Sequence, residues 1–409
     1  MIQFFRFFAF LPFAILLLQS CYSTNPESKQ QKVQSDAKTD SQILDYNPIN
    51  ANKEIDAFMQ NLHKKSYFNG NVLVAKKGKI IYQNAIGWAD YLHRDSLKIN
   101  SVFELASVTK PFTATAIMML LEEGKLKLDQ DVRDFYPNFP YAGITIKLLL
   151  THRSGMMNYV YFTDNIWKSK HKDERIGISN LDVMNLLAEY KPSPYNVPNR
   201  RFHYNNSNFM VLAAIIEKVS GKPYSDFMKE RIFKPSGMKN TSVFSKAVYD
   251  KIPVDVVGHD RIWRRSVAQN FLDGPVGDKG IYSTIHDLFL FDQAMRNGRL
   301  ISKTSMDSSY SPHNEMEKGH FNYGYGWRMY IDGENQKVVY HTGWWHGFRH
   351  IYLRDLKNDV TIILLSNLTN GSLLKLDDLY KIVGMPVVRR SAYSGNGKAE
   401  PSINDTMED

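Results

Sequence analysis

The chain has 409 residues, with 51 lysines and arginines against 42 aspartates and glutamates, and a formal net charge of +9. That length is enough to bury a large core, as one domain or two lobes. The positive charge is spread over short clusters such as Arg200-Arg201 and Arg264-Arg265. Binding of nucleic acid needs a concentrated basic stripe, so we expect no nucleic-acid partner.

The first residues form an apolar targeting segment. A run from Phe7 to Leu18 follows Arg6 and ends in Gln19-Ser20-Cys21. The run is too short for a comfortable membrane span, and it ends as a bacterial lipoprotein signal does, with a small residue just before the cysteine. Cys21 is the only cysteine. It therefore cannot form an internal disulfide, and lipidation explains its presence. The alternative is an ordinary secretory signal or a signal anchor.

Lipidation of Cys21 would make the chain an exported bacterial lipoprotein, anchored in a membrane and facing the periplasm or the cell exterior. The stretch from Tyr22 to about Asp45 is polar and typical of a flexible tether. The C-terminal residues are similarly polar. We therefore predict a signal peptide at residues 1–20, a tether at 21–45, a folded domain at 46–388 and a polar tail at 389–409.

The predicted domain opens with a helix and a hairpin. A stripe of apolar residues at helical spacing predicts a helix over Ile55–His63. Two short apolar runs follow, Asn71–Ala75 and Lys79–Gln83. They are typical of two strands joined by a tight turn, because Gly78 lies between them.

The next predicted element, an amphipathic helix over Val108–Glu123 ended by Gly124, begins beside the first candidate catalytic pair. Ser107 and Lys110 are separated by close to one helical turn, so they share a face. A serine hydroxyl is a poor nucleophile until a base takes its proton, and a lysine with a suppressed charge can take part in that transfer. Ser-x-x-Lys is an acyl-transfer signature, although the same letters also fit an N-cap serine with a solvated lysine.

A mainly helical stretch from Thr145 to about Lys234 contains the second candidate segment, Tyr204-Asn205-Asn206, just before a helix over Asn206–Val219. A tyrosine near a lysine ammonium can have its pKa lowered, and the resulting phenolate can act as a general base. The Asn206 side chain can offer a donor and an acceptor to an amide. The alternative is an asparagine-rich turn with an N-cap.

Strand-like runs return late in the chain, and one of them carries the third candidate segment. The run Lys337–His341 leads through Thr342 and Gly343 to Trp344. We expect a strand that ends in a glycine-containing turn. There Gly343 would let a substrate approach the backbone, and N–H groups could bind an oxyanion. The alternative is an edge strand that ends in an aromatic turn.

Predicted strands therefore flank a helical stretch in the sequence. The other late strands are expected over Tyr325–Tyr330, Phe348–Leu353 and Val360–Asn367, and a last helix over Leu373–Ile382. This order predicts an α+β fold, with one mixed sheet assembled from both ends of the chain and a helical lobe inserted. A cleft between two lobes is a common place for a small-molecule site.

The three candidate segments occur in the order and approximate spacing of the serine β-lactamase-like family. That family includes class C β-lactamases, D,D-peptidases and related esterases. Its pattern is Ser-x-x-Lys, Tyr-x-Asn, then Lys-Thr-Gly or His-x-Gly, and here the segments are Ser107-Val108-Thr109-Lys110, Tyr204-Asn205-Asn206 and His341-Thr342-Gly343. The resemblance covers roughly Ile55 to Val383 and implies a β-lactamase/transpeptidase-like fold, a mixed antiparallel sheet flanked by helices, for the 46–388 domain.

The resemblance also implies catalytic roles. Ser107 would be the nucleophile that forms an acyl-enzyme. Lys110 would hydrogen-bond Ser107 and keep Tyr204 anionic, or would itself share the proton. Tyr204 would act as the general base, and Asn206 would hold the substrate amide.

The third segment would supply the remaining substrate contacts. His341, Thr342 and Gly343 would line the strand that docks the substrate, and the first two could contact a substrate carboxylate. The backbone N–H groups of Ser107 and Trp344 would form the oxyanion hole. Only the amide of Trp344 is needed there, so its bulky side chain is compatible with the role.

His341 stands where class C β-lactamases have a lysine. Histidine is only partly charged near neutral pH, which weakens the case for a dedicated β-lactamase. We therefore expect a membrane-tethered serine hydrolase that cuts an amide or ester bond in a small-molecule or peptide substrate. The alternatives are a D,D-carboxypeptidase or β-lactamase, and a non-turnover penicillin-binding sensor of the same fold.

The partners expected are the substrate and a lipid bilayer, through lipidated Cys21. No cofactor is expected, and no spacing of His, Asp or Glu resembles a metal site. The sequence patterns name neither the substrate nor the oligomeric state.

Overall fold

The structure is a computed structural model that describes residues 52–170, 177–244, 255–261, 264–314, 320–332 and 336–388. The predicted signal peptide with Cys21, the tether and the polar tail all lie outside these residues. In the described part of the chain, no helix is both long enough and apolar enough to cross a bilayer. Lipidation and the predicted domain limits therefore stay predictions.

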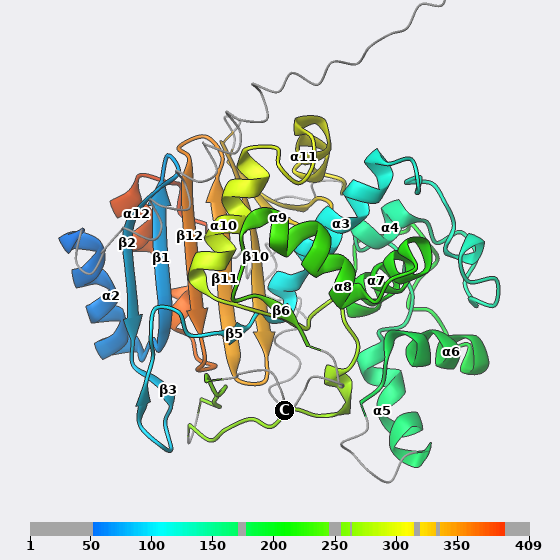
Figure 1. Ribbon diagram of the computed structural model, residues 1–409, viewed down its shortest axis with the longest axis horizontal. Helices are drawn as coiled ribbons and strands as arrows, with labels where there is room; N and C mark the ends of the chain where they lie inside the picture. Colours follow the sequence, from blue (N-terminus) through cyan, green and yellow to red (C-terminus); the bar gives the residue numbers. More distant parts are fainter. Residues whose placement is uncertain are drawn as a thin grey trace, which may run out of the picture. The chain divides into compact units, whose positions relative to one another are not determined.

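One large sheet of seven strands is built from both ends of the chain (Figure 1). Its strand order is β2-β1-β12-β11-β10-β9-β8, and every neighbouring pair is antiparallel. Strand β1 pairs with the last strand, β12, so that Gly70 faces Ser366. The predicted α+β fold is confirmed. The strands are β1 Gly70–Lys76, β2 Lys79–Ile86, β8 Phe321–Tyr323, β9 Arg328–Asp332, β10 Gln336–Trp345, β11 Phe348–Asp355 and β12 Val360–Ser366.

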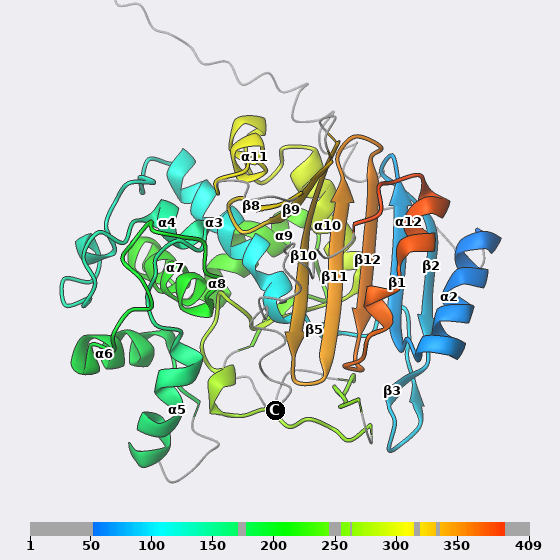
Figure 2. The ribbon, with the colours of Figure 1, turned by 180° about the vertical axis from the view of Figure 1, so that it is seen from behind.

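Helices cover both faces of this sheet. On one face lie α2 (Lys53–Ser66) and α12 (Asp377–Val383), which Figure 2 shows in front of the strands. Their apolar side chains pack with alternate residues of the strands. Helix α10 (Ile285–Arg296) packs on β1 and β12 from the other face. Because it is covered on both sides, β12 is buried along its whole length.

The predicted helical stretch forms a lobe beside the β8–β10 end of the sheet (Figure 1). Helix α7 lies at its centre, in contact with α3, α4, α5, α6 and α8, and its residues from Ser207 to Ile216 are all buried. The helices of the lobe are α3 Lys110–Glu122, α4 Ile146–Leu150, α5 Tyr159–Lys170, α6 Asn180–Tyr190, α7 Asn206–Ser220 and α8 Tyr224–Met228.

Two predictions about the candidate segments are corrected. Helix α3 is not amphipathic, because its residues from Lys110 to Leu120 are all buried, and Ser107 lies in a preceding 3₁₀ turn, η1 (Ala106–Thr109). Such a helix is surrounded by protein on all sides.

The glycine-containing turn predicted at Gly343 is also wrong, because β10 continues to Trp345, which pairs with Phe348. The actual turn is His346-Gly347, with φ of +44° and +82°. Positive φ at both central residues is the geometry that a two-residue hairpin requires.

A small second sheet connects the lobe to the serine turn. Its order is β5-β7-β6, with β5 at Phe103–Glu104, β7 at Ile281–Ser283 and β6 at Ser242–Val243. Strand β5 leads directly into η1, and the Leu105 N–H donates to the Ile281 carbonyl at 2.8 Å. The turn that carries Ser107 is therefore held by backbone hydrogen bonds as well as by packing.

Candidate active site

Ser107 lies in a turn with a strained residue beside it. Ala106 has a φ of +49°, a left-handed conformation that is uncommon for a residue with a Cβ atom. Backbone strain of this kind clusters at functional sites, where the surrounding structure enforces it. Ser107 is partly exposed, whereas Lys110 is fully buried. The hydroxyl group therefore borders solvent while its amine partner does not.

The Lys110 ammonium contacts three acceptors. Its Nζ atom donates to Ser107 Oγ at 2.9 Å, to Asn206 Oδ1 at 2.9 Å and to the Asp278 carbonyl at 3.0 Å. These contacts connect Ser107, the side chain of Asn206 and the loop at Asp278 through one buried amine.

Tyr204 lies beside two positive charges. Lys110 Nζ lies 5.0 Å from the centroid of its ring, and the Arg328 guanidinium lies 4.6 Å from the same centroid. Burial raises the pKa of Tyr204. The charges of Lys110 and Arg328, together with hydrogen bonds from Lys110 and Ser107, lower this pKa by more than burial raises it. The net effect is a lowered pKa, which favours the phenolate.

Arg328 was not singled out by the sequence. It is the first residue of β9 and lies outside the three candidate segments. Its Nε atom is buried and has no hydrogen-bond partner among the described residues. A second cation with unused hydrogen-bonding capacity therefore lies beside Tyr204.

Asn206 is the first residue of α7, directly after Asn205, whose side chain caps the helix by accepting from the Ser207 N–H. This cap directs Asn206 toward Lys110. Its Oδ1 atom is taken by Lys110, which leaves the Nδ2 amide to donate to a substrate.

His341 is more enclosed than its predicted role implies. The side chain is fully buried, with Nε2 at 3.1 Å from the Tyr323 hydroxyl and Nδ1 at 2.8 Å from the Thr342 carbonyl. Burial, with the charges of Arg328 and Lys110, holds the pKa of His341 well below its usual range. His341 is thus neutral, and a direct contact with a substrate would have to break these contacts. Thr342 is partly exposed.

Gly343 allows β10 to pack against the serine turn. A Cβ atom there would lie 2.4 Å from the Leu105 carbonyl oxygen. The glycine is thus required by close contact with the protein's own backbone. This packing brings the strand that carries Trp344 next to Ser107, as an oxyanion hole formed by their two amides requires.

A buried loop behind Lys110 completes the site and was also missed by the sequence analysis. Asp278 Oδ2 accepts from the Tyr159 hydroxyl at 3.0 Å, and Lys279 Nζ donates to the same hydroxyl. Asp278 and Lys279 are 1% and 4% exposed. The loop positions the Asp278 carbonyl that accepts from Lys110 Nζ.

Comparisons with known proteins identify the protein family to which this chain belongs. The sequence model of the Beta-lactamase family matches residues 52–383, and the chain belongs to this family. It is a serine hydrolase of the penicillin-binding-protein-like group. Ser107, Lys110, Tyr204 and Asn206 are brought together by the fold, while their catalytic roles stay predictions.

Among its relatives is penicillin-binding protein 4* of Bacillus subtilis, 37% identical over 331 residues, which cover 78% of this chain and 72% of the relative. The structure resembles a penicillin-binding protein from Bacillus halodurans, with a TM-score of 0.70 and 24% identity over 79% of this chain and 98% of that one. It also resembles a D-amino acid amidase from Ochrobactrum anthropi, with a TM-score of 0.64 and 22% identity over 77% and 91%. These two likenesses show the fold alone.

Proposed function

We propose that this chain is a membrane-tethered serine hydrolase that cuts an amide bond in a carboxylate-bearing peptide, through an acyl-enzyme on Ser107. The observation that carries the proposal is the position of Lys110 Nζ, 2.9 Å from Ser107 Oγ and close to a tyrosine with a lowered pKa. The nucleophile Ser107, its electrostatic partner Lys110 and the base Tyr204 are then within reach of one another. Nucleophilic catalysis requires this arrangement.

In the proposed reaction, the Tyr204 phenolate takes the proton of the Ser107 hydroxyl as Oγ attacks the substrate carbonyl. The backbone N–H groups of Ser107 and Trp344 stabilise the oxyanion. The C–N bond then breaks, and Tyr204 returns the proton to the leaving amine. Tyr204 then takes a proton from water as the water oxygen attacks the ester. The bond between the acyl carbon and Ser107 Oγ breaks, Tyr204 gives the proton to Oγ, and the acid is released.

The charges around the site support a substrate with a carboxylate. His341 is neutral, so the docking strand supplies no permanent cation. Arg328 supplies one instead, with a buried Nε that has no partner in the described residues. An arginine binds carboxylates strongly through charge-assisted hydrogen bonds. The name of the Bacillus subtilis relative, a penicillin-binding protein, supports a peptidase that is acylated by penicillin.

The proposed tether is a lipid on Cys21, with the polar residues up to about 45 as a spacer. It rests on the apolar run before the only cysteine in the chain. The hydrolase would then act on substrates near the outer side of a bacterial membrane.

The test is intact-mass spectrometry of the protein after exposure to a fluorophosphonate and, separately, to penicillin. Ser107→Ala is the matched control. We expect both reagents to add their mass to the wild-type chain and neither to add it to the variant. A chain that takes up neither reagent would contradict the proposed nucleophile.

The penicillin arm separates the alternatives. A long-lived adduct together with release of a D-amino acid from a peptide ending in two D-alanines supports the peptidase. Rapid release of hydrolysed penicillin would favour a β-lactamase instead. A stable adduct without turnover of any peptide would favour a penicillin-binding sensor. Labelling by the fluorophosphonate alone would favour an esterase or other amide hydrolase.

A further inference from the structure

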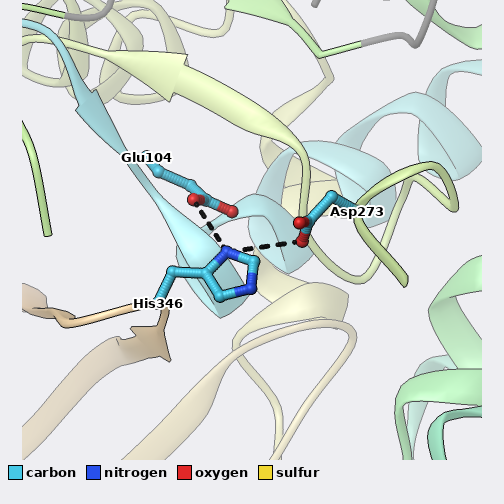
Figure 3. Close-up of side chains that lie close together, drawn as sticks. All are labelled: Glu104, Asp273 and His346. Carbon is cyan, nitrogen blue, oxygen red and sulfur yellow. Dashed lines mark ion pairs between the residues drawn. The ribbon is translucent and has the colours of Figure 1, made fainter. Parts of the chain in front are cut away.

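A second buried cluster of ionisable groups lies close to Ser107 and takes no part in the proposed reaction. Glu104 in β5, Asp273 at the end of the 3₁₀ turn η5 (Phe271–Asp273) and His346 in the β10–β11 turn point toward one another (Figure 3). Their side chains are 3%, 4% and 7% exposed. One ligand atom from each lies within 4.8 Å of the other two.

The ion pairs inside this cluster are longer than an ordinary N–H···O hydrogen bond of about 2.7–3.2 Å. His346 Nδ1 lies 3.7 Å from Glu104 Oε2 and 3.4 Å from Asp273 Oδ1. Glu104 Oε2 and His346 Nδ1 are buried without a hydrogen-bond partner among the described residues. Buried polar atoms in native proteins normally have hydrogen-bond partners. Two buried atoms that lack partners and face the same point therefore indicate a bound group at that point.

Lys279, a cation whose charge also acts on Asp273, makes its own contacts elsewhere. Lys279 Nζ lies 3.7 Å from Asp278 Oδ2, donates to the Tyr159 hydroxyl and sits 5.3 Å from the centroid of the Trp345 ring. Its charge is therefore paired with Asp278. Glu104 Oε2 is left buried without a hydrogen-bond partner among the described residues, which is costly, and a bound cation would offset that cost.

The donor set fits a small divalent metal ion. Zinc binds imidazole nitrogen and carboxylate oxygen at about 2.0–2.2 Å, and the edges of a tetrahedron of that size measure about 3.4 Å. The separation of 3.4 Å between His346 Nδ1 and Asp273 Oδ1 matches such an edge, and the separation of 3.7 Å between His346 Nδ1 and Glu104 Oε2 is slightly longer. Asp273 is also oriented by a hydrogen bond from Trp345 Nε1 at 2.6 Å, as metal-binding carboxylates are by their outer partners.

We propose that Glu104, Asp273 and His346 form a binding site for a divalent transition-metal ion of the zinc type. The positions of two of these ligands in the chain give the site a structural role. Glu104 lies three residues before Ser107, and His346 lies two residues after Trp344. A metal ion would tie the serine turn, the end of β10 and the loop at η5 to one point, and so fix the two amides of the proposed oxyanion hole.

The test uses the full-length chain, purified in detergent, stripped with a chelator and dialysed against Zn²⁺ or Co²⁺. We expect one ion per chain by elemental analysis, a higher melting temperature with Zn²⁺, and visible d–d absorption with Co²⁺. Glu104→Gln, Asp273→Asn and His346→Asn should each weaken binding more than about 100-fold, beyond the usual cost of losing an outer partner. Asparagine tolerates the positive φ at position 346.

Two variants serve as controls. Ser107→Ala removes the nucleophile and should leave metal binding unchanged. Asp287→Asn alters a buried carboxyl group elsewhere, one that accepts from Thr241, and should also leave it unchanged. Circular dichroism of each ligand variant establishes that it is folded.

The proposal is overturned if the folded wild type retains no metal, or if the three ligand variants bind as the wild type does. The alternative to a bound metal ion is a protonated His346 that pairs with the two carboxylates. In that case stability would fall as pH rises through the pKa of His346, which the two carboxylates raise against the opposing effect of burial. Because metal binding is read directly, its failure leaves the function proposed for Ser107 untouched.

Discussion

Tyr204 illustrates how single residues define the chemistry of this site. The charges of Lys110 and Arg328 lie 5.0 and 4.6 Å from the centroid of its ring, and these outweigh the burial that would otherwise keep the hydroxyl protonated. A lowered pKa moves the phenolate toward the pH at which a base is useful. The proposed base therefore depends on two neighbouring cations. Only one of them, Lys110, belongs to a sequence motif.

We expect Arg328→Gln to shift the pH dependence of acylation. Loss of this positive charge raises the pKa of Tyr204, so the acid limb of the rate profile should move to higher pH. The measurement is the rate of fluorophosphonate labelling across pH. Arg328→Lys should restore most of the profile, and Arg231→Gln, at a surface arginine paired with Glu123, should not change it. An unmoved profile in Arg328→Gln would remove Tyr204 as the base.

Gly343→Ala should disturb the serine turn. The added Cβ atom would meet the Leu105 carbonyl oxygen at 2.4 Å, so either the turn or β10 must move. We expect a loss of about 1–3 kcal/mol in unfolding free energy and a marked fall in the rate of acylation. The matched control is Gly371→Ala, where nothing lies within 4 Å of the new atom. Unfolding in urea and labelling kinetics check both effects, and equal behaviour of the two variants would contradict this account.

At the scale of elements, α10 is joined to the sheet by a buried ion pair as well as by apolar packing. Asp292 Oδ1 lies 2.7 Å from Arg354 Nε of β11, and both residues are almost fully buried. Asp292 also accepts from the Tyr352 hydroxyl at 3.2 Å and the Thr361 hydroxyl at 3.1 Å. The Asp292 carboxylate therefore binds side chains from β11 and β12, and these contacts hold α10 against the sheet.

Asp292→Ala should destabilise the fold by about 3–5 kcal/mol, because it leaves the Arg354 charge buried without its partner. Unfolding in urea, with a circular dichroism readout, measures the loss. Asp307→Ala removes the partner of Lys303 in an exposed pair and serves as the control, with no measurable change expected. A loss in Asp292→Ala no larger than that of the control would show that Arg354 finds another partner.

At the scale of the whole molecule, both ends of the chain build one sheet and the helical lobe lies between them in sequence. Ser107 follows β5, Tyr204 precedes α7 and Gly343 lies in β10. The site therefore exists only when the lobe and the sheet are packed together. Anchorage is a separate matter, because the proposed lipid site at Cys21 is linked to the domain only by a polar segment.

Cys21→Ser should release the protein from the membrane. Acyl chains contribute about 0.8 kcal/mol per buried CH₂ group, and the variant would lose them all. We expect the wild type in the membrane fraction of cells and the variant in the soluble fraction, with fluorophosphonate labelling of Ser107 unchanged in both. A variant that stays in the membrane would identify the N-terminal segment as a signal anchor.

Local patterns made several features predictable. Ser107 and Lys110 are three residues apart, so a single helical turn is enough to bring them together, and the contact is present at 2.9 Å. The hairpin of β1 and β2 depends likewise on neighbours in the chain. The ordered occurrence of three short motifs also indicated the family, which the comparisons confirmed.

The remaining features depend on residues far apart in the sequence. Arg328 reaches Tyr204 only because β9 lies beside β10 at the lobe, and no motif marks it. Burial, a property of the packed structure, makes His341 neutral and turns the expected amphipathic helix into a core helix. The sequence predicts a turn at Gly343, but backbone packing requires this glycine within a strand.

The sequence by itself determined the class of chemistry, because a nucleophile and its amine need only one turn of backbone to meet. Only the tertiary structure decided which charges surround them. It also brought together Glu104, Asp273 and His346 from three distant segments, which no spacing could indicate. The physical reason is the range of the interactions. Hydrogen bonds within a turn follow from neighbouring residues, whereas burial and electrostatic fields depend on everything packed around a group.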